Sequence, residues 1–229
     1  MSIASSFLSA SQKKAELAAM KLGKTDEQKD VIDYFMKDGG CGCLGGSSKL
    51  TTDAYLGLIN NKCAALNLRE RALAKIGLDE SQISEIPPIL MTSFVYGGTD
   101  GKLFEKYDNG MFVTSRYSVT WIFFSSEQMY TYQFIFNLTS DDTREITNDI
   151  FYNDITNLRT VTKQKEHIEP LVGCGCLGKP KAEKMLYSYS EFEVVGAGFD
   201  YSYFMRTTDS IEQSIQAAKQ MLREKKYSK

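Results

Sequence analysis

The chain has 229 residues, of which 42% are hydrophobic and 24% are charged, and its formal net charge is −2. This composition is that of an ordinary globular protein, and the chain is long enough to form a buried core that does not need disulfides or metal ions to stabilise it. A charge so near zero gives no field that would recruit nucleic acid, and no apolar run is long enough to cross a bilayer. The N-terminal stretch lacks the basic and apolar blocks of a secretory signal, so we expect a cytoplasmic, reducing environment.

The first third of the chain predicts helices. A moderately apolar stripe predicts a first helix that ends at Gly23. Thr25 and Gln28 have the spacing of a capping box, in which each side chain accepts from the other residue's backbone N–H, and they predict the start of a second helix. Thr52 or Asp53 is predicted to cap a third, long helix, and Gly77 is predicted to end it, because glycine suits the left-handed C-terminal cap.

Beyond Pro87 and Pro88 the chain becomes rich in β-branched and aromatic residues. Large aromatic side chains alternate with smaller ones in one segment, as on one face of a pleated strand: Tyr130, Tyr132, Phe134 and Phe136. We predict strands at 89–96, 103–107, 111–115, 117–125, 129–138, 155–162, 184–195 and 201–206. The last segment predicts one amphipathic helix after Asp209, with Ile211, Ile215, Ala218 and Leu222 on its apolar side.

Two segments between these strands are predicted to be irregular. The acidic residues Asp141, Asp142, Glu145 and Asp149 predict a solvated, capped helical turn. Residues 163–183 predict a long insertion, because a hairpin connection is usually much shorter.

Short antiparallel strands followed by one terminal amphipathic helix resemble the pleckstrin-homology-like superfold in its bacterial, GRAM-like form. The stretch before the segment Ile-Phe-Tyr-Asn-Asp-Ile-Thr-Asn-Leu at 150–158, that segment itself and the helix from Asp209 carry the resemblance. It implies an α+β protein in which a bent antiparallel sheet or barrel is capped by the C-terminal helix. We therefore predict a helical N-terminal region, 1–87, and a pleckstrin-homology-like β domain, 88–229.

The hexapeptide Gly-Cys-Gly-Cys-Leu-Gly occurs twice, at 40–45 and 173–178, and uses four of the five cysteines: Cys41, Cys43, Cys174 and Cys176. Four thiolates are a complete ligand set for a tetrahedral zinc ion. Because one copy lies in the helical region and the other in the β domain, a shared zinc would clasp the two parts together. Such a clasp would close a long loop and favour the folded state.

Other interpretations of the motif remain open. The thiols could form strained local disulfides or pair across the loops, as in a redox protein. They could instead hold an iron–sulfur cluster, since four thiolates also suit one, or be inert and bind no cofactor. His167 lies seven residues before Cys174 and is either a solvated loop residue, an outer ligand of the metal or a hydrogen-bond partner of its ligands. Cys63 lies on the apolar side of the third helix and is predicted to be a small buried residue.

No catalytic motif is found in the chain: there is no P-loop, no dinucleotide fingerprint and no nucleophile elbow. We therefore predict a non-catalytic interaction module that a cysteine-ligated zinc stabilises, with an unknown protein or a lipid surface as its partner. The alternatives are a thiol redox protein or sensor, and a peripheral membrane-binding module that attracts anionic lipid through its C-terminal lysines.

Overall fold

The computed structural model describes residues 10–36, 48–83, 86–97, 103–108, 110–171 and 181–227. Its helices are α1 (Ala10–Lys21), α2 (Asp26–Met36), α3 (Thr52–Ala65), α4 (Leu68–Ile76), the short 3₁₀ helix η2 (Glu80–Ile83) and α5 (Asp209–Tyr227). The strands are β1 (Ile89–Phe94), β2 (Glu105–Asp108), β3 (Met111–Thr114), β4 (Arg116–Phe124), β5 (Gln128–Asn137), β6 (Thr143–Phe151), β7 (Ile155–Leu171), β8 (Lys181–Gly196) and β9 (Phe199–Met205).

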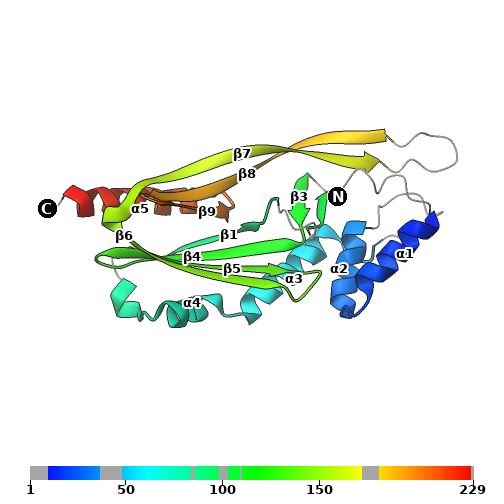
Figure 1. Ribbon diagram of the computed structural model, residues 1–229, viewed down its shortest axis with the longest axis horizontal. Helices are drawn as coiled ribbons and strands as arrows, with labels where there is room; N and C mark the ends of the chain where they lie inside the picture. The colour runs from blue at the N-terminus through cyan, green and yellow to red at the C-terminus, as the bar shows by residue number, and fades with distance from the viewer. Residues whose placement is uncertain are drawn as a thin grey trace.

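The strands form three antiparallel sheets, in the orders β1-β4-β5-β6, β2-β3 and β7-β8-β9. β9 lies beside β1, where the Arg206 N–H donates to the Thr92 carbonyl over 3.2 Å. The molecule is elongated, and the β7–β8 hairpin runs along much of its length (Figure 1). The predicted α+β class with a C-terminal helix is confirmed, and the described strands do not close into a barrel.

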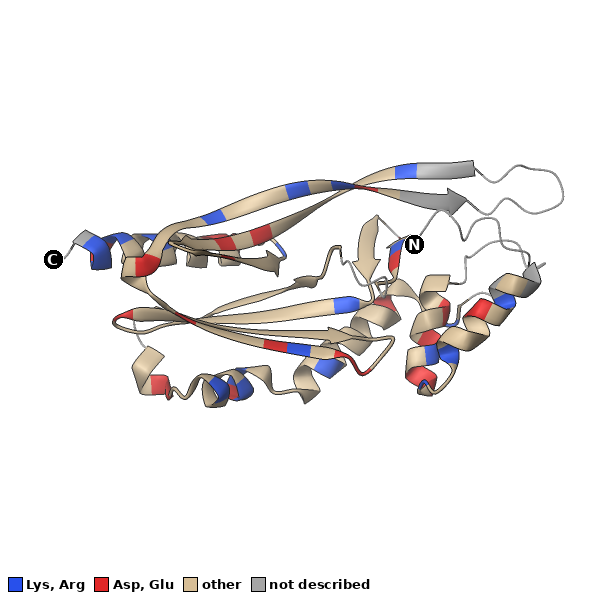
Figure 2. Ribbon diagram, in the orientation of Figure 1, with Lys and Arg blue, Asp and Glu red and all other residues tan. Residues whose placement is uncertain are grey.

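Two apolar cores lie on opposite faces of the four-stranded sheet. The first core joins helices α2 to α4 to one face, and it includes Tyr34, Tyr55 and Phe123. All four aromatic residues of the alternating segment in β5 belong to this core, as the sequence predicts. The second core joins the other face to β7–β9 and α5, and it includes Ile122 and Phe192. The charged residues lie mainly on the helices and on strands β6, β7 and β8. Strand β5, inside the four-stranded sheet, carries none (Figure 2).

Two of the helix signals in the sequence are confirmed, and two are wrong. The cap of α3 is Thr51, whose hydroxyl accepts from the Ala54 N–H, rather than Thr52 or Asp53. The Thr25 N–H donates to Gln28 Oε1 over 3.1 Å and the Gln28 N–H donates to Thr25 Oγ1 over 3.2 Å, so the capping box forms. Gly77 ends α4 in the left-handed conformation. The single long helix predicted before it is wrong, because the chain breaks at Asn67, whose φ is 45°. Asparagine tolerates this conformation better than most residues.

Both segments predicted to be irregular contain strands. The acidic segment forms β6, which pairs with β5 along its whole length. Of the two acidic residues in β6, Asp149 is exposed, whereas Glu145 is 19% exposed and accepts from Arg71 of α4. Asp141 and Asp142 lie before the strand begins. Residues 163–171 and 181–183 lengthen β7 and β8, so the predicted insertion is reduced to the connection 172–180. His167 therefore lies in a strand rather than in a solvated loop.

The C-terminal helix packs on the second core as its sequence pattern predicts. Ile215 and Ala218 are almost fully buried, and Met221 and Leu222 extend the same apolar side. Figure 1 shows α5 alongside β9 at the end of the molecule that lies farthest from α1. The helix thus covers the apolar face that the open β7–β9 sheet would leave exposed to water.

The same substitution at two glycines should change stability in opposite directions. A Cβ atom at Gly196 would overlap the Phe199 ring and lie 2.5 Å from the Asp154 carbonyl oxygen, whereas a Cβ at Gly57, inside α3, meets nothing within 4 Å. We expect Gly196→Ala to lower the free energy of unfolding by about 1–3 kcal/mol. We expect Gly57→Ala to raise it by about 0.5–1 kcal/mol. Urea unfolding measures both, and a raised midpoint for Gly196→Ala would contradict the tight β8–β9 turn.

Candidate functional site

The four cysteines of the repeated hexapeptide lie outside the described residues. Cys41 and Cys43 fall within 37–47, and Cys174 and Cys176 fall within 172–180. Cys63 is described: it has a free thiol, is partly buried and packs against the first core. Burial raises the pKa of this thiol, so its role is that of a small apolar side chain rather than of a reactive one.

The residues on either side of the first cysteine segment are tied to each other. Tyr34, near the end of α2, and Thr52, at the start of α3, share a hydrogen bond of 2.9 Å between their hydroxyl groups. The Thr52 hydroxyl also donates to the carboxylate of Asp108, at the end of β2. The segment between α2 and α3 therefore begins and ends at one fixed place beside β2.

The second cysteine segment likewise begins and ends at one place. Leu171 and Lys181 are the last paired residues of the β7–β8 hairpin. Further back along the hairpin, the side chains of His167 and Tyr187 enclose Phe112 of β3. The Phe112 and Tyr187 rings stack at 3.7 Å between centroids, and His167 meets Phe112 edge-on at 4.9 Å.

Strand β2 joins these two places. On one side, Lys106 Nζ donates to the Tyr34 carbonyl over 3.2 Å and lies 4.3 Å from the centre of the Tyr34 ring. On the other side, the Glu105 carboxylate lies 3.8 Å from both Lys165 Nζ and His167 Nδ1. We call this set of contacts the β2 junction. Two neighbouring residues of one strand thus contact the approaches to both cysteine segments, which sequence spacing alone does not reveal.

His167 is held mostly out of water at the β2 junction. Its side chain is 17% exposed, and burial lowers its pKa below the ordinary histidine value, an effect that Glu105 opposes and Lys165 reinforces. The Tyr187 hydroxyl is buried and has no hydrogen-bond partner in the described part of the chain. Burial raises the pKa of Tyr187, so the phenol stays protonated. The interior of the β2 junction therefore favours neutral side chains.

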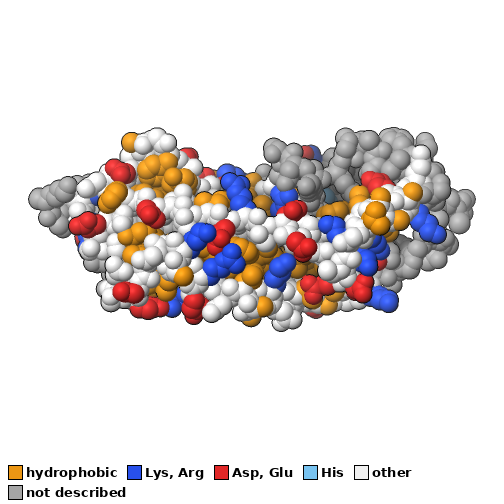
Figure 3. Space-filling view, turned by 60° about the horizontal axis from the view of Figure 1, so that its bottom comes forward, with side chains coloured by type: hydrophobic (Ala, Val, Ile, Leu, Met, Phe, Trp, Pro, Cys, Tyr) orange, Lys and Arg blue, Asp and Glu red, His pale blue; other side chains and the backbone are white. Residues whose placement is uncertain are grey.

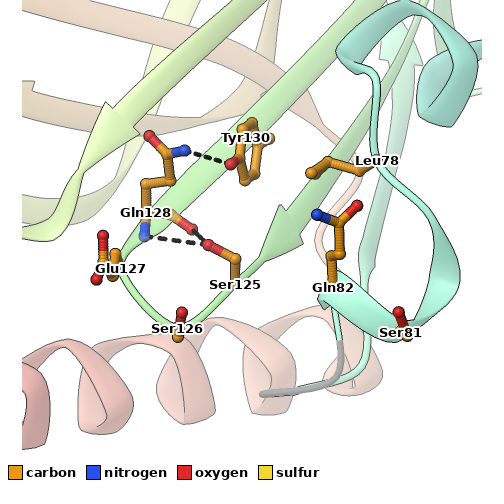
Figure 4. A pocket seen from close by; sticks show the side chains of 8 residues that line it. All are labelled: Leu78, Ser81, Gln82, Ser125, Ser126, Glu127, Gln128 and Tyr130. Atoms are coloured by element: carbon orange, nitrogen blue, oxygen red, sulfur yellow. Dashed lines mark hydrogen bonds between the residues drawn. The ribbon is translucent and has the colours of Figure 1, made fainter.

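A separate cavity of about 340 Å³ lies between η2 and the turn that joins β4 to β5 (Figure 4). It is lined mostly by hydroxyl and amide side chains, with Leu78 and Tyr130 as its large nonpolar surfaces. The sequence contains no motif that indicates this cavity, because its two walls come from segments far apart in the chain.

Within the described ranges, no three His, Cys, Asp or Glu side chains gather in a group that could hold a metal ion. No helix in that part of the chain is long and apolar enough to cross a membrane. Comparisons with protein families, with curated proteins and with solved structures find no match to the chain. The resemblance to pleckstrin-homology-like domains therefore stays a prediction.

His167 should make the stability of the protein depend on pH. Because burial lowers the folded-state pKa, the unfolded chain binds a proton first as the pH falls. The contribution of neutral His167 is complete above the unfolded-state pKa of about 6.5 and is lost as the pH falls through the lower folded-state value. His167 is the single histidine of the chain. We expect the urea midpoint of the wild type to fall between pH 7.5 and 5.5 more than that of His167→Gln. Equal slopes for the two proteins would contradict burial of this ring.

Proposed function

We propose that this chain is a non-catalytic interaction module in which Cys41, Cys43, Cys174 and Cys176 hold one zinc ion. The zinc joins the α2–α3 connection to the tip of the β7–β8 hairpin. Four thiolates satisfy the tetrahedral preference of zinc and leave no open position for a substrate, which is typical of a structural rather than a catalytic site.

The β2 junction is the observation that carries this proposal. Tyr34 and His167 are each seven residues from the first cysteine of the following motif, Cys41 and Cys174. Seven extended residues reach at most about 25 Å. Because Lys106 contacts Tyr34 and the adjacent Glu105 contacts His167, the two parts of the chain that lead into the cysteine segments lie beside the same strand. From there α2 continues to Met36 and β7 continues to Leu171 before the two segments begin. Two loops that started at opposite ends of this elongated molecule could not meet in this way.

The surface supports a protein partner rather than a catalytic role. Figure 3 shows a face on which acidic and basic side chains alternate, with apolar atoms in small groups between them. A surface of mixed charge gives specificity to protein contacts without a strong field of either sign. The described titratable groups include ion pairs and buried phenols but no paired acid and base in a cavity, which is the arrangement that general acid–base catalysis needs.

Metal analysis of the purified protein tests the zinc clasp. We expect one zinc per chain in the wild type and none in the double variants Cys41→Ser/Cys43→Ser and Cys174→Ser/Cys176→Ser, because each removes two of four ligands. Cys63→Ser is the matched control and should keep the zinc. At free zinc a hundredfold above its Kd, binding adds about 2.7 kcal/mol of stability. This corresponds to a Tm difference of about 5–11 °C for a chain of this size.

A different result would identify the alternative function. Metal-free wild-type protein whose thiols oxidise and reduce reversibly would refute the zinc clasp and support a thiol redox protein. Zinc retained by both double variants would place any metal elsewhere on the chain. An iron–sulfur cluster would show as bound iron and visible absorbance in place of zinc.

Sedimentation with vesicles tests the lipid-surface alternative. We expect no binding to vesicles that contain phosphatidylserine, because the net charge of −2 and the mixed surface charge give anionic lipid little attraction. Binding that is lost on adding salt would instead show that the partner is a membrane surface.

A further inference from the structure

We infer that the cavity between η2 and the β4–β5 turn binds a small neutral molecule rich in hydroxyl groups, of about the size of a monosaccharide. The volume of about 340 Å³ lies at the lower end of the range for small-molecule sites. Figure 4 shows Gln82 and Leu78 on one side of the cavity, and Tyr130, Gln128 and the turn on the other.

The wall formed by the β4–β5 turn is held by hydrogen bonds on both sides. The Ser125 N–H donates to the Gln128 carbonyl over 3.0 Å, and the Gln128 N–H donates back to Ser125 Oγ over 3.2 Å. From beneath the turn, the Tyr152 hydroxyl donates to the Ser125 carbonyl over 2.7 Å and the Tyr152 N–H donates to the Glu127 carbonyl over 3.2 Å. Because the turn is already ordered, a ligand would lose little affinity in ordering it.

The opposite wall is fixed by the end of α4. Gly77 adopts a φ of 78°, and the N–H groups of Gly77 and Leu78 both donate to the Leu73 carbonyl, over 2.8 and 3.1 Å. The Asp79 N–H then donates to Gln82 Oε1 over 3.0 Å. This bond orients the Gln82 amide so that its NH₂ group is left for another acceptor.

The cavity offers both donors and acceptors that have no partner within the described ranges. The Gln128 amide donates to the Tyr130 oxygen, so the Tyr130 proton is left to donate and Gln128 Oε1 is left to accept. The Gln82 NH₂ group and the Ser126 hydroxyl add to this set, and both residues line the cavity. A hydroxyl group both donates and accepts, so a ligand with several hydroxyls matches such a mixed set.

The charge around the cavity disfavours an anion. No lysine or arginine lines the cavity, and the single charged side chain among its lining residues is that of Glu127. The nearby Arg69 guanidinium is taken up by the carboxylate of Glu80 in a two-pronged ion pair, with Nη2 2.8 Å from Oε2. A phosphate or carboxylate would therefore enter without a positive partner, which is costly.

Titration of the ¹⁵N-labelled full chain with D-glucose tests this inference. We expect saturable chemical-shift changes confined to 77–82 and 125–130. Tyr130→Phe, which removes one hydroxyl and keeps the ring, should weaken the binding about fivefold, the effect of one lost hydrogen bond. Tyr201→Phe is the matched control, because Tyr201 packs on Phe199 outside the cavity, and it should leave the affinity unchanged.

Glucose 6-phosphate separates a neutral ligand from an anion. We expect it to bind more weakly than glucose, because the added charge finds no cation in the cavity. Tighter binding of the phosphate would overturn the neutral class. Shifts that are absent or spread over the molecule, or a Tyr130→Phe affinity equal to that of the wild type, would overturn the site itself. None of these results depends on the zinc content of the protein.

Discussion

The fold depends on the burial of both faces of the β1-β4-β5-β6 sheet. Phe123 of β4 lies in the first core, and its neighbours Ile122 and Phe124 lie in the second. A strand that is apolar on both faces must be covered on both sides. The helices α2–α4 cover one face of the sheet, and the layer of α5 with strands β7, β8 and β9 covers the other, so both layers are needed to keep the sheet out of water. Each large side chain contributes about 1.5–3 kcal/mol on burial, which exceeds the contribution of any exposed ion pair in the molecule.

Polar contacts position the layers that the apolar faces hold together. Glu145 of β6 accepts from Arg71 of α4 over 2.9 Å and from the Tyr132 hydroxyl over 2.6 Å, and Lys75 of α4 lies 3.5 Å away. The hydrogen bonds from Arg71 and Tyr132 lower the pKa of Glu145 to about 2. Arg71 and Lys75 are about half exposed, so water screens their charge. We therefore assign this cluster the role of orienting α4 over the sheet rather than of stabilising the core.

The sequence predicted the conformation correctly where that conformation depends on residues close together in the chain. The capping box of Thr25 and Gln28 and the alternation along β5 could be predicted because each depends on neighbours within a few residues. The break at Asn67 could not, because the residues on both sides of it form helix. The acidic residues of β6 suggested a helical turn, but pairing with β5 decides the conformation there. Neither the β2 junction nor the cavity has a sequence signal, since each joins segments that are far apart in the chain.

The β2 junction also bears on how a zinc ion would act. Its ion pair between Lys165 and Glu105, at 3.8 Å, involves partly exposed side chains and is worth at most about 1 kcal/mol, and its stacked rings add a similar amount. Such contacts hold the hairpin near α2 but let this end open at a low free-energy cost. By keeping the two cysteine segments close, they reduce the entropy that metal binding must overcome. The first core meets the junction at Tyr34, and the second core shares no residue with it. Both cores are buried by contacts that do not involve the metal. Removing zinc should therefore loosen this end and leave the rest folded, unlike a zinc finger, which unfolds without its ion.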